Sequence, residues 1–181
     1  LDAPRFVQEI TAKMMAGVGD QLTVSQLPLD GTYPSGTTAW EKRNVSDSVP
    51  EWKPDLCIQC GNCSFVCPHS VIRAKFYHQD SLQNSPAGFK SARISARGFP
   101  ETRYTLQIYL EDCTGCNLCV EVCPAISLKE SGVKAINMTA KAPLMTQEKD
   151  NIRFFETLPF NDRSRVDFSS IRGAQFLQPL F

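Results

Sequence analysis

The chain has 181 residues, with 19 basic and 19 acidic side chains and a formal net charge of zero. It contains no basic domain and no nucleic-acid recognition motif, so we expect no nucleic-acid partner. No apolar run is long enough to span a bilayer, so we expect no membrane segment.

Residues 1–52 are expected to form an N-terminal connector, a short helix followed by extended chain. The apolar residues of the helix recur near helical spacing and predict a packing face: Phe6, Val7, Ile10, Met14 and Met15. Gly17 and Gly19 are predicted to end it. The density of proline and glycine after residue 21 indicates an irregular segment, which Trp40 and Trp52 would anchor.

All eight cysteines fall into two copies of one pattern, Cys-x2-Cys-x2-Cys-x3-Cys-Pro. The copies comprise Cys57, Cys60, Cys63 and Cys67, and Cys113, Cys116, Cys119 and Cys123. This spacing is typical of two-cluster bacterial ferredoxins, in which the fourth cysteine of each run ligates the other cluster. We therefore expect two [4Fe–4S] clusters, the first bound by Cys57, Cys60, Cys63 and Cys123 and the second by Cys113, Cys116, Cys119 and Cys67.

Other uses of these cysteines fit the spacing less well. Zinc modules place pairs of cysteines on either side of a longer loop. Disulfide frameworks belong to short secreted chains, and a [3Fe–4S] centre would be favoured only if one ligand were missing. Thiolates that hold iron need a reducing compartment, which predicts a cytoplasmic location.

The 2[4Fe–4S] domain is expected to span residues 53–141, with an insertion at 69–112 between the two motifs. Residues 71–77 are predicted to form a strand. Alternating apolar and polar residues at 104–110 predict a second, half-buried strand. Residues 133–138 are predicted to form a closing strand after the second motif.

The first part of the insertion is rich in basic residues. Between 69 and 103 the basic side chains are Arg73, Lys75, Lys90, Arg93, Arg97 and Arg103, against the acidic Asp80 and Glu101. One hypothesis is an electrostatic docking patch for an acidic electron carrier. The alternative is a solvated face or a set of contacts within the chain.

Residues 142–181 are expected to form a C-terminal connector with a possible strand at 152–155 and no core of its own. The predicted fold class is therefore α+β: a bacterial 2[4Fe–4S] ferredoxin-like domain with an insertion and long irregular flanking connectors. No Ser/His/Asp constellation, phosphate loop or dinucleotide fingerprint is present, so we expect no catalytic residue. The predicted chemistry is one-electron transfer.

Segments outside the cysteines resemble the pyruvate:ferredoxin (flavodoxin) oxidoreductase family. They are MMAGxGDxLxVS at 14–25, DGTxPxGTxxWEKR at 30–43 and QFLxPL at 175–180, beside the cluster runs at 60–70 and 113–125. Generic ferredoxins lack the segments outside the cluster runs. The resemblance covers essentially the whole chain.

The resemblance implies an enzyme that oxidatively decarboxylates pyruvate with coenzyme A, giving acetyl-CoA and carbon dioxide. It places thiamine diphosphate, Mg²⁺ and a third [4Fe–4S] cluster on other domains of the same enzyme, toward which residues 142–181 lead. The present segment would relay electrons to ferredoxin or flavodoxin, within a homodimer. The alternatives are a free-standing 2[4Fe–4S] ferredoxin, disfavoured by zero net charge and long connectors, and a related enzyme acting on another 2-oxo acid.

Overall fold

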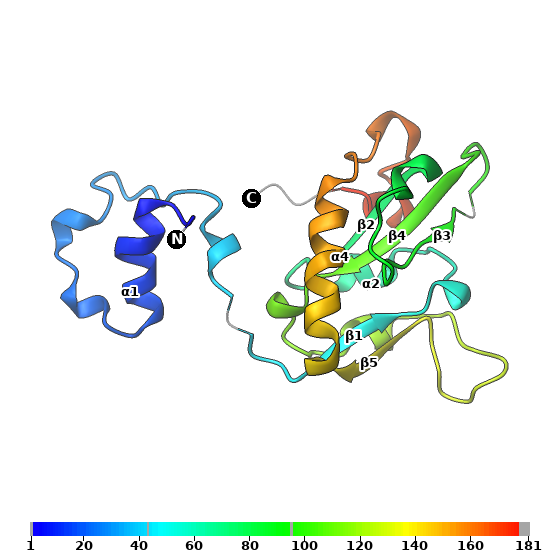
Figure 1. Cartoon of the computed structure of the whole chain (residues 1–181), viewed down its shortest axis with the longest axis horizontal. Coiled ribbons are helices and arrows are strands. Elements are labelled where there is room, and N and C mark those ends of the chain that lie inside the picture. Colours follow the sequence, from blue (N-terminus) through cyan, green and yellow to red (C-terminus); the bar gives the residue numbers. More distant parts are fainter. Residues whose placement is uncertain (1, 43, 95, 178–181) are drawn as a thin grey trace. The chain divides into compact units, whose positions relative to one another are not determined.

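The computed structural model describes residues 2–42, 44–94 and 96–177, and the chain divides into two compact units (Figure 1). The smaller unit comprises Leu1–Arg43 with Leu180–Phe181, and the larger comprises Asn44–Pro179. In the part of the chain described, no helix has the length and apolar character needed to cross a membrane. All eight cysteines belong to the larger unit.

The smaller unit contains the helix predicted near the N-terminus. A π-helical turn, Val7–Thr11, continues directly into α1, Ala12–Met15. Gly17 follows at φ +73°, a left-handed conformation that suits glycine and ends the helix as predicted. Three 3₁₀ turns complete the unit, at Gly19–Gln21, Val24–Gln26 and Thr37–Trp40.

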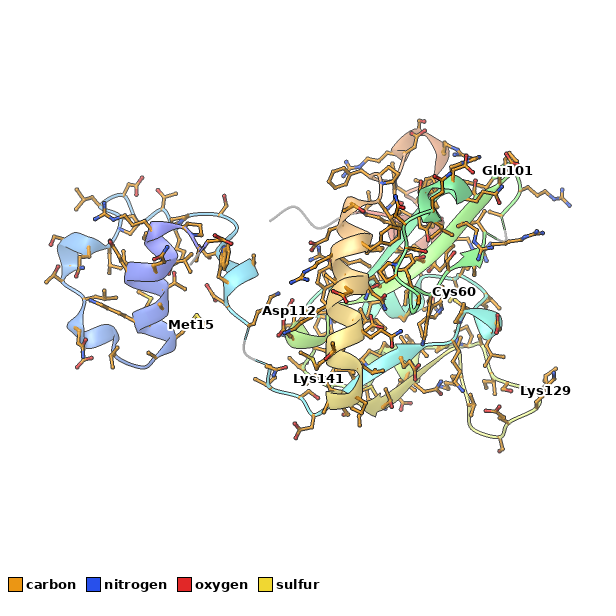
Figure 2. All side chains as sticks on the ribbon, in the orientation of Figure 1. Met15, Cys60, Glu101, Asp112, Lys129 and Lys141 are labelled. Atoms are coloured by element: carbon orange, nitrogen blue, oxygen red, sulfur yellow. The ribbon has the colours of Figure 1, made fainter. Side chains whose placement is uncertain are left out.

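The predicted packing face of this helix is only partly buried. Val7 and Ile10 are 6% exposed, whereas Met15, labelled in Figure 2, keeps 51% of its surface exposed. Tyr33 packs edge-on against Phe6 with ring centroids 4.9 Å apart. Trp40, expected as an anchor, is 41% exposed, whereas Trp52, the other expected anchor, is 3% exposed. The Phe6–Tyr33 pair rather than Trp40 therefore holds the irregular segment to the helix.

The larger unit contains two antiparallel sheets, which are joined through the cysteine loops. In one, β1 (Ser48–Trp52) pairs with β5 (Ile136–Ala140); in the other, the order is β2 (Ile72–His78), β4 (Thr102–Ile108) and β3 (Ala92–Arg93). The strands predicted at 71–77 and 104–110 are confirmed, and the closing strand begins three residues later than its predicted start. The α+β class is confirmed.

Both halves of this unit follow the same path. β1 leads through the 3₁₀ turn Pro54–Leu56 and the first cysteine loop into α2, Asn62–Val66, and then β2. β4 leads through Leu110–Asp112 and the second loop into α3, Leu118–Glu121, and then β5. The repeated sequence motif is therefore also a repeated structural motif.

A helix replaces the strand predicted at 152–155. α4 spans Met145–Thr157 and runs across the strands (Figure 1). The strand prediction was wrong because Phe154 and Phe155 resemble part of a β-strand, although helical spacing places Asn151 and Phe155 on one buried face. The following short helix, α5, spans Ile171–Ala174.

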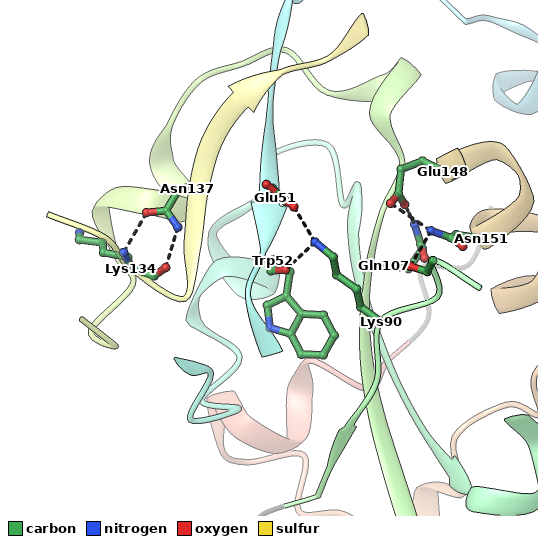
Figure 3. A network of polar contacts seen from close by, with 9 residues as sticks. Glu51, Trp52, Lys90, Gln107, Lys134, Asn137, Glu148 and Asn151 are labelled. Atoms are coloured by element: carbon green, nitrogen blue, oxygen red, sulfur yellow. Dashed lines mark hydrogen bonds and ion pairs between the residues drawn. The ribbon is translucent and has the colours of Figure 1, made fainter. Parts of the chain in front are cut away.

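The helix changes the burial of β4. Thr105 and Gln107, predicted to lie on a solvent face, are only 1% and 4% exposed. The Gln107 amide donates to the Glu148 carboxylate of α4 at 2.8 Å (Figure 3). Both faces of β4 are therefore covered, so the strand is buried rather than half-buried.

The segment after α4 also packs within the larger unit. The Asn161 side chain accepts a hydrogen bond from the Phe76 N–H at 2.9 Å and donates to the carbonyls of Ala74 and Phe176. Phe176 is 5% exposed and lies edge-on to Phe76. The part of the predicted C-terminal connector that is described, 142–177, thus contributes to the core that surrounds the cysteines.

Several basic residues of the insertion bind their own chain. Lys75 is 3% exposed, and Lys90 pairs with Glu51 at 2.7 Å. Arg103 donates to the side chain and carbonyl of Ser91, and the Arg73 guanidinium lies 4.5 Å from the centre of the Tyr109 ring. For these four basic residues, contacts within the chain account for the charge without a docking patch.

Candidate iron–sulfur sites

The first cysteine loop curls back toward its own sulfur. The Cys57 N–H donates to the carbonyl of Pro54, which closes the preceding turn. Gln59 adopts φ +56° and Gly61 φ +83°, and this pair of left-handed residues reverses the chain before α2. The Gln59 N–H consequently lies 3.3 Å from Cys57 Sγ and donates to it.

The second loop repeats this geometry with different residues. The Cys113 N–H donates to the carbonyl of Leu110. Gly115 and Asn117 adopt φ +70° and +66° at the positions matching Gln59 and Gly61. The Gly115 N–H donates to Cys113 Sγ at 3.4 Å, so each loop presents an amide to its leading cysteine.

The eight cysteines line two separate cavities. One is lined by Cys57, Cys60, Cys63 and Cys123, and the other is lined by Cys67, Cys113, Cys116 and Cys119. Each cavity thus receives three cysteines from one motif and the fourth from the other motif. Apolar side chains form much of the remaining walls, among them Leu106 and Ile136 in the first cavity and Val71 and Met138 in the second, which His69, Thr114 and Asn117 also line.

The donor set of each cavity fits a four-iron cube. Thiolate is the ligand that iron–sulfur clusters take in proteins. Across residues 2–42, 44–94 and 96–177, no three His, Cys, Asp or Glu side chains converge closely enough to hold a single metal ion. Four thiolates around one cavity are the ligand set that a [4Fe–4S] cluster takes from a protein.

A buried donor beside the first cavity has no acceptor among the residues that the structure describes. Trp52, at the end of β1, is 3% exposed and lines the cavity, and its indole Nε1 has no hydrogen-bond partner in residues 2–42, 44–94 and 96–177. The indole nevertheless lowers the pKa of Cys57 against the larger effect of burial. The N–H therefore lies near the Cys57 sulfur without a completed hydrogen bond, as expected if a cluster occupies the cavity.

The metal-free thiols resist ionisation. Burial raises the pKa of Cys57, Cys63 and Cys113, and it raises the pKa of Cys119 to about 11. Neighbouring cysteines of the same cavity add to each increase, since thiolates repel one another. These thiols are protonated at neutral pH in the metal-free chain, and a bound metal must displace their protons.

The C-terminal helix α5 clamps the first loop. Arg172 donates to the carbonyls of Ile58 and Gln59, at 2.8 and 3.2 Å. The Gln175 amide donates to the same Gln59 carbonyl at 3.1 Å and accepts from the Tyr104 hydroxyl at 2.7 Å. Helix α5, β4 and the first loop therefore form one hydrogen-bonded assembly.

The cysteines differ in exposure. Cys113 and Cys119 are buried, Cys116 is exposed, and the other five lie between these extremes, among them Cys60, labelled in Figure 2. All eight predicted ligands thus lie at a cavity. The sequence did not identify the supporting residues Gln59, Arg172 and Gln175, since no motif marks them, and it had assigned Trp52 to a different role.

Comparison with known families finds two matches. A family described as "4Fe-4S dicluster domain" matches residues 56–127, the stretch that contains both cysteine loops. A family named EKR and described as "Domain of unknown function" matches residues 1–46. The second match covers the smaller unit, so this unit also belongs to a recurring sequence family.

Curated relatives match the chain along almost its whole length. It is 49% identical over 179 residues to the "Pyruvate-flavodoxin oxidoreductase" of Nostoc sp., and equally so to the "Probable pyruvate-flavodoxin oxidoreductase" of Escherichia coli. It is 36% identical over 181 residues to the "Pyruvate:ferredoxin oxidoreductase" of Moorella thermoacetica. Each match covers 99% of this chain and 15% of the relative, so the chain spans about one-seventh of the length of these enzymes.

Proposed function

Because this chain belongs to the pyruvate-flavodoxin oxidoreductase family and contains its 4Fe–4S dicluster domain, we propose that it is the electron-relay segment of such an enzyme. The observation that carries the proposal is the pair of cavities, each lined by four cysteines drawn from both motifs. When bound, [4Fe–4S] clusters supply reversible one-electron transfer.

We propose crossed ligation of the two clusters. Cys57, Cys60, Cys63 and Cys123 would hold the first cluster, and Cys113, Cys116, Cys119 and Cys67 the second. Each cavity is lined by three cysteines of one motif and by the fourth cysteine of the other motif, which supports this assignment. Crossed ligands tie the two halves of the domain together, so the chain itself fixes the separation between the clusters.

The other residues have two tasks at these sites. The N–H groups of Gln59 and Gly115 stabilise negative charge on the sulfurs of Cys57 and Cys113. Apolar walls such as Leu106 and Val71 exclude water and lower the local dielectric. None of these tasks requires a side chain to transfer a proton, so the chain needs no catalytic residue.

The complete enzyme would act on pyruvate and coenzyme A and release acetyl-CoA and carbon dioxide. Thiamine diphosphate, Mg²⁺ and a third [4Fe–4S] cluster would lie on its other domains, which are the immediate partners of this segment. Ferredoxin or flavodoxin would accept the electrons, and the enzyme would be a cytoplasmic homodimer. The names and lengths of the relatives support this larger assembly.

The finer organisation of the chain is part of the same proposal. Residues 69–112 would form an insertion in the 2[4Fe–4S] domain, and residues 1–52 and 142–181 would connect it to neighbouring domains. Fully exposed apolar side chains such as Leu29 (96%) and Leu128 (104%) support contacts with those domains.

A free-standing ferredoxin is the less favoured alternative. The chain is 49% identical to a large enzyme over 179 residues, including the region before the first cysteine. A diffusible carrier needs only the cluster loops and short strands, so it does not explain similarity across residues 1–46.

The decisive measurement is the iron and sulfide content of the anaerobically purified chain, with an EPR spectrum after dithionite reduction. We expect about eight irons and eight sulfides, four of each per cluster, and a spectrum from two interacting reduced clusters. Four irons would mean that the crossed ligation is wrong or that one site is not assembled, and zinc without iron would overturn the proposal altogether.

A further inference from the structure

We propose that Trp52 donates its indole N–H to the sulfur shell of the first cluster and raises the reduction potential of that cluster relative to the second. This inference rests on the proposed ligation and adds a residue that tunes the potential. Trp52 is a positioning residue, because it would act through a hydrogen bond to sulfur rather than through a bond to iron.

The position of the indole supports this role. Trp52 is 3% exposed and lines the cavity of Cys57, Cys60, Cys63 and Cys123, and in the described part of the chain its Nε1 has no hydrogen-bond partner. A buried donor without an acceptor destabilises the fold, because it loses its hydrogen bond to water. Native structures rarely retain such a cost unless an unplaced ion, water or cofactor accepts the hydrogen bond.

The surrounding contacts fix the ring in place. The Trp52 carbonyl accepts from Lys90 Nζ at 3.1 Å, and Lys90 also pairs with Glu51. Figure 3 shows the indole nitrogen on the side of the ring away from Lys90. Tyr104 packs edge-on with its centroid 5.8 Å away, while its own hydroxyl donates to Gln175. The ring is therefore held without any contact that uses the N–H.

The second half of the domain lacks this donor. Trp52 ends β1 five residues before Cys57, and Ile108 ends β4 five residues before Cys113. Neither tryptophan nor tyrosine is among the residues that line the second cavity in the described part of the chain. Each leading cysteine receives one backbone N–H, so the indole is an additional donor at the first site only.

An N–H···S hydrogen bond favours the more negative, reduced state of a cluster. Two clusters with matched loop amides would therefore differ in potential, and the first would be reduced more readily. The difference would bias where a single electron resides within the relay.

The test removes the N–H without changing the shape of the ring. In a Trp40→Phe background, Trp52 is the sole tryptophan. Growth with benzothienylalanine then replaces its N–H by sulfur. EPR-monitored redox titration compares this chain with the Trp40→Phe parent. At a fixed solution potential, we expect the ratio of reduced to oxidised first cluster to fall about tenfold in the analogue. This corresponds to a decrease of about 59 mV in the one-electron reduction potential.

Two further observations make the outcome decisive. Indole labelled with ¹⁵N in the parent should show a hyperfine coupling to one reduced cluster, and this coupling should vanish in the analogue. Loading of the parent with eight irons tests, independently of Trp52, whether both clusters are present. If both chains are fully loaded and have equal potentials with no ¹⁵N coupling, the role of Trp52 is overturned while the relay stands.

Discussion

Gln59 adopts a conformation that is costly for any residue other than glycine. It has φ +56° where the second loop has Gly115, and a left-handed residue with a Cβ costs about 1–2 kcal/mol. The side-chain amide of Gln59 donates to the backbone carbonyl of Arg93 at 2.6 Å. The backbone carbonyl of Gln59 accepts from Arg172 and Gln175. These contacts offset the cost and bind the first loop to the insertion and to α5.

Gly61 provides a test of this packing. An added Cβ would lie 2.9 Å from the Ile171 carbonyl oxygen and 3.0 Å from Gln175, at φ +83°. Gly132 has a similar φ of +76° but no atom within 4 Å of an added Cβ. We expect Gly132→Ala to cost about 1 kcal/mol from backbone strain and Gly61→Ala to cost at least about 2 kcal/mol, since it must also displace α5.

The measurement for both glycine variants is the temperature at which the visible absorbance of the loaded chain bleaches. The Gly61→Ala chain should bleach at a lower temperature than the Gly132→Ala chain. Equal bleaching temperatures would mean that α5 does not restrain the first loop.

Crossed ligation makes a prediction about pairs of cysteine variants. Cys57→Ala and Cys123→Ala remove ligands from one cavity, whereas Cys67→Ala and Cys113→Ala remove ligands from the other. In the EPR spectra of the reduced chains, the first two variants should therefore perturb one cluster and the last two the other. Spectra that pair Cys123→Ala with Cys113→Ala would show that each motif serves its own cluster.

Among single residues, the sequence identifies the predicted cluster ligands but not the residues that hold the ligand loops in place. Cysteines are recognisable because their spacing matches the geometry of a cluster loop. Arg172 and Gln175 lie more than 110 residues from the carbonyls that they bind. No local pattern encodes such a contact, because the fold of the intervening chain brings the partners together.

Helix α4 depends on a lysine from β2. Lys75 Nζ donates to the carbonyls of Phe155 and Leu158, at 2.9 and 2.7 Å, where the helix ends. The Phe155 carbonyl also accepts from the Leu158 N–H at 3.3 Å, and carbonyls at a helix C-terminus lack the regular intrahelical partner. A buried cation at a helix C-terminus also interacts favourably with the helix dipole. Lys75 is therefore a helix cap rather than part of a docking surface.

Replacing Lys75 should weaken this attachment. Lys75→Met keeps an unbranched apolar stem but removes the ammonium donor from the carbonyls of Phe155 and Leu158, so we expect a loss of about 1–3 kcal/mol in unfolding free energy. Lys149→Met is the matched control, because Lys149 belongs to α4 itself but its side chain is 55% exposed. It should change stability by less than about 0.5 kcal/mol. Equal losses in urea unfolding of the two variants would refute the capping role.

Burial of this amine also predicts a pH dependence. Desolvation lowers the pKa of Lys75 below its usual value of 10.5, with a smaller opposing effect from Glu156. The unfolded chain then binds the proton more tightly than the folded chain, so stability rises as pH increases from the folded pKa toward 10.5. The stability difference between the wild-type chain and Lys75→Met should grow over this interval. A stability difference that stays constant with pH would contradict the lowered pKa of Lys75.

At the scale of elements, strands were easier to predict than helices. β2 and β4 carry β-branched and aromatic residues with clear alternation, and they pair with each other along their whole length. α4 was misread because its strongest apolar cluster is short, and its charged residues hide the helical period. The same helix also covers β4, so one missed element led to a second error about burial.

At the scale of the whole molecule, the cluster chemistry is confined to one unit. Val49 and Trp52 of β1 are buried in the core that contains the cysteines. The boundary is set by contacts of Asn44, whose N–H donates to the Glu111 carbonyl at 3.2 Å and whose carbonyl accepts from Lys141 Nζ at 3.4 Å. The boundary predicted from the sequence at residue 52 would instead assign β1, with Val49 and Trp52, to the N-terminal connector.

A pair of truncations distinguishes these two boundaries. A chain that begins at Asn44 keeps β1 and every contact described for the cysteine loops, so we expect it to bind the same iron as the full chain. A chain that begins at Pro54 loses β1, leaves β5 without its partner strand and opens the wall of the first cavity. We expect it to bind little iron, because an isolated strand and an open cavity protect neither backbone nor cluster. The iron content of the two chains after anaerobic reconstitution decides between them. Full loading of both would make β1 dispensable, whereas loss of iron from the longer one would give residues 1–43 a direct part in holding the clusters.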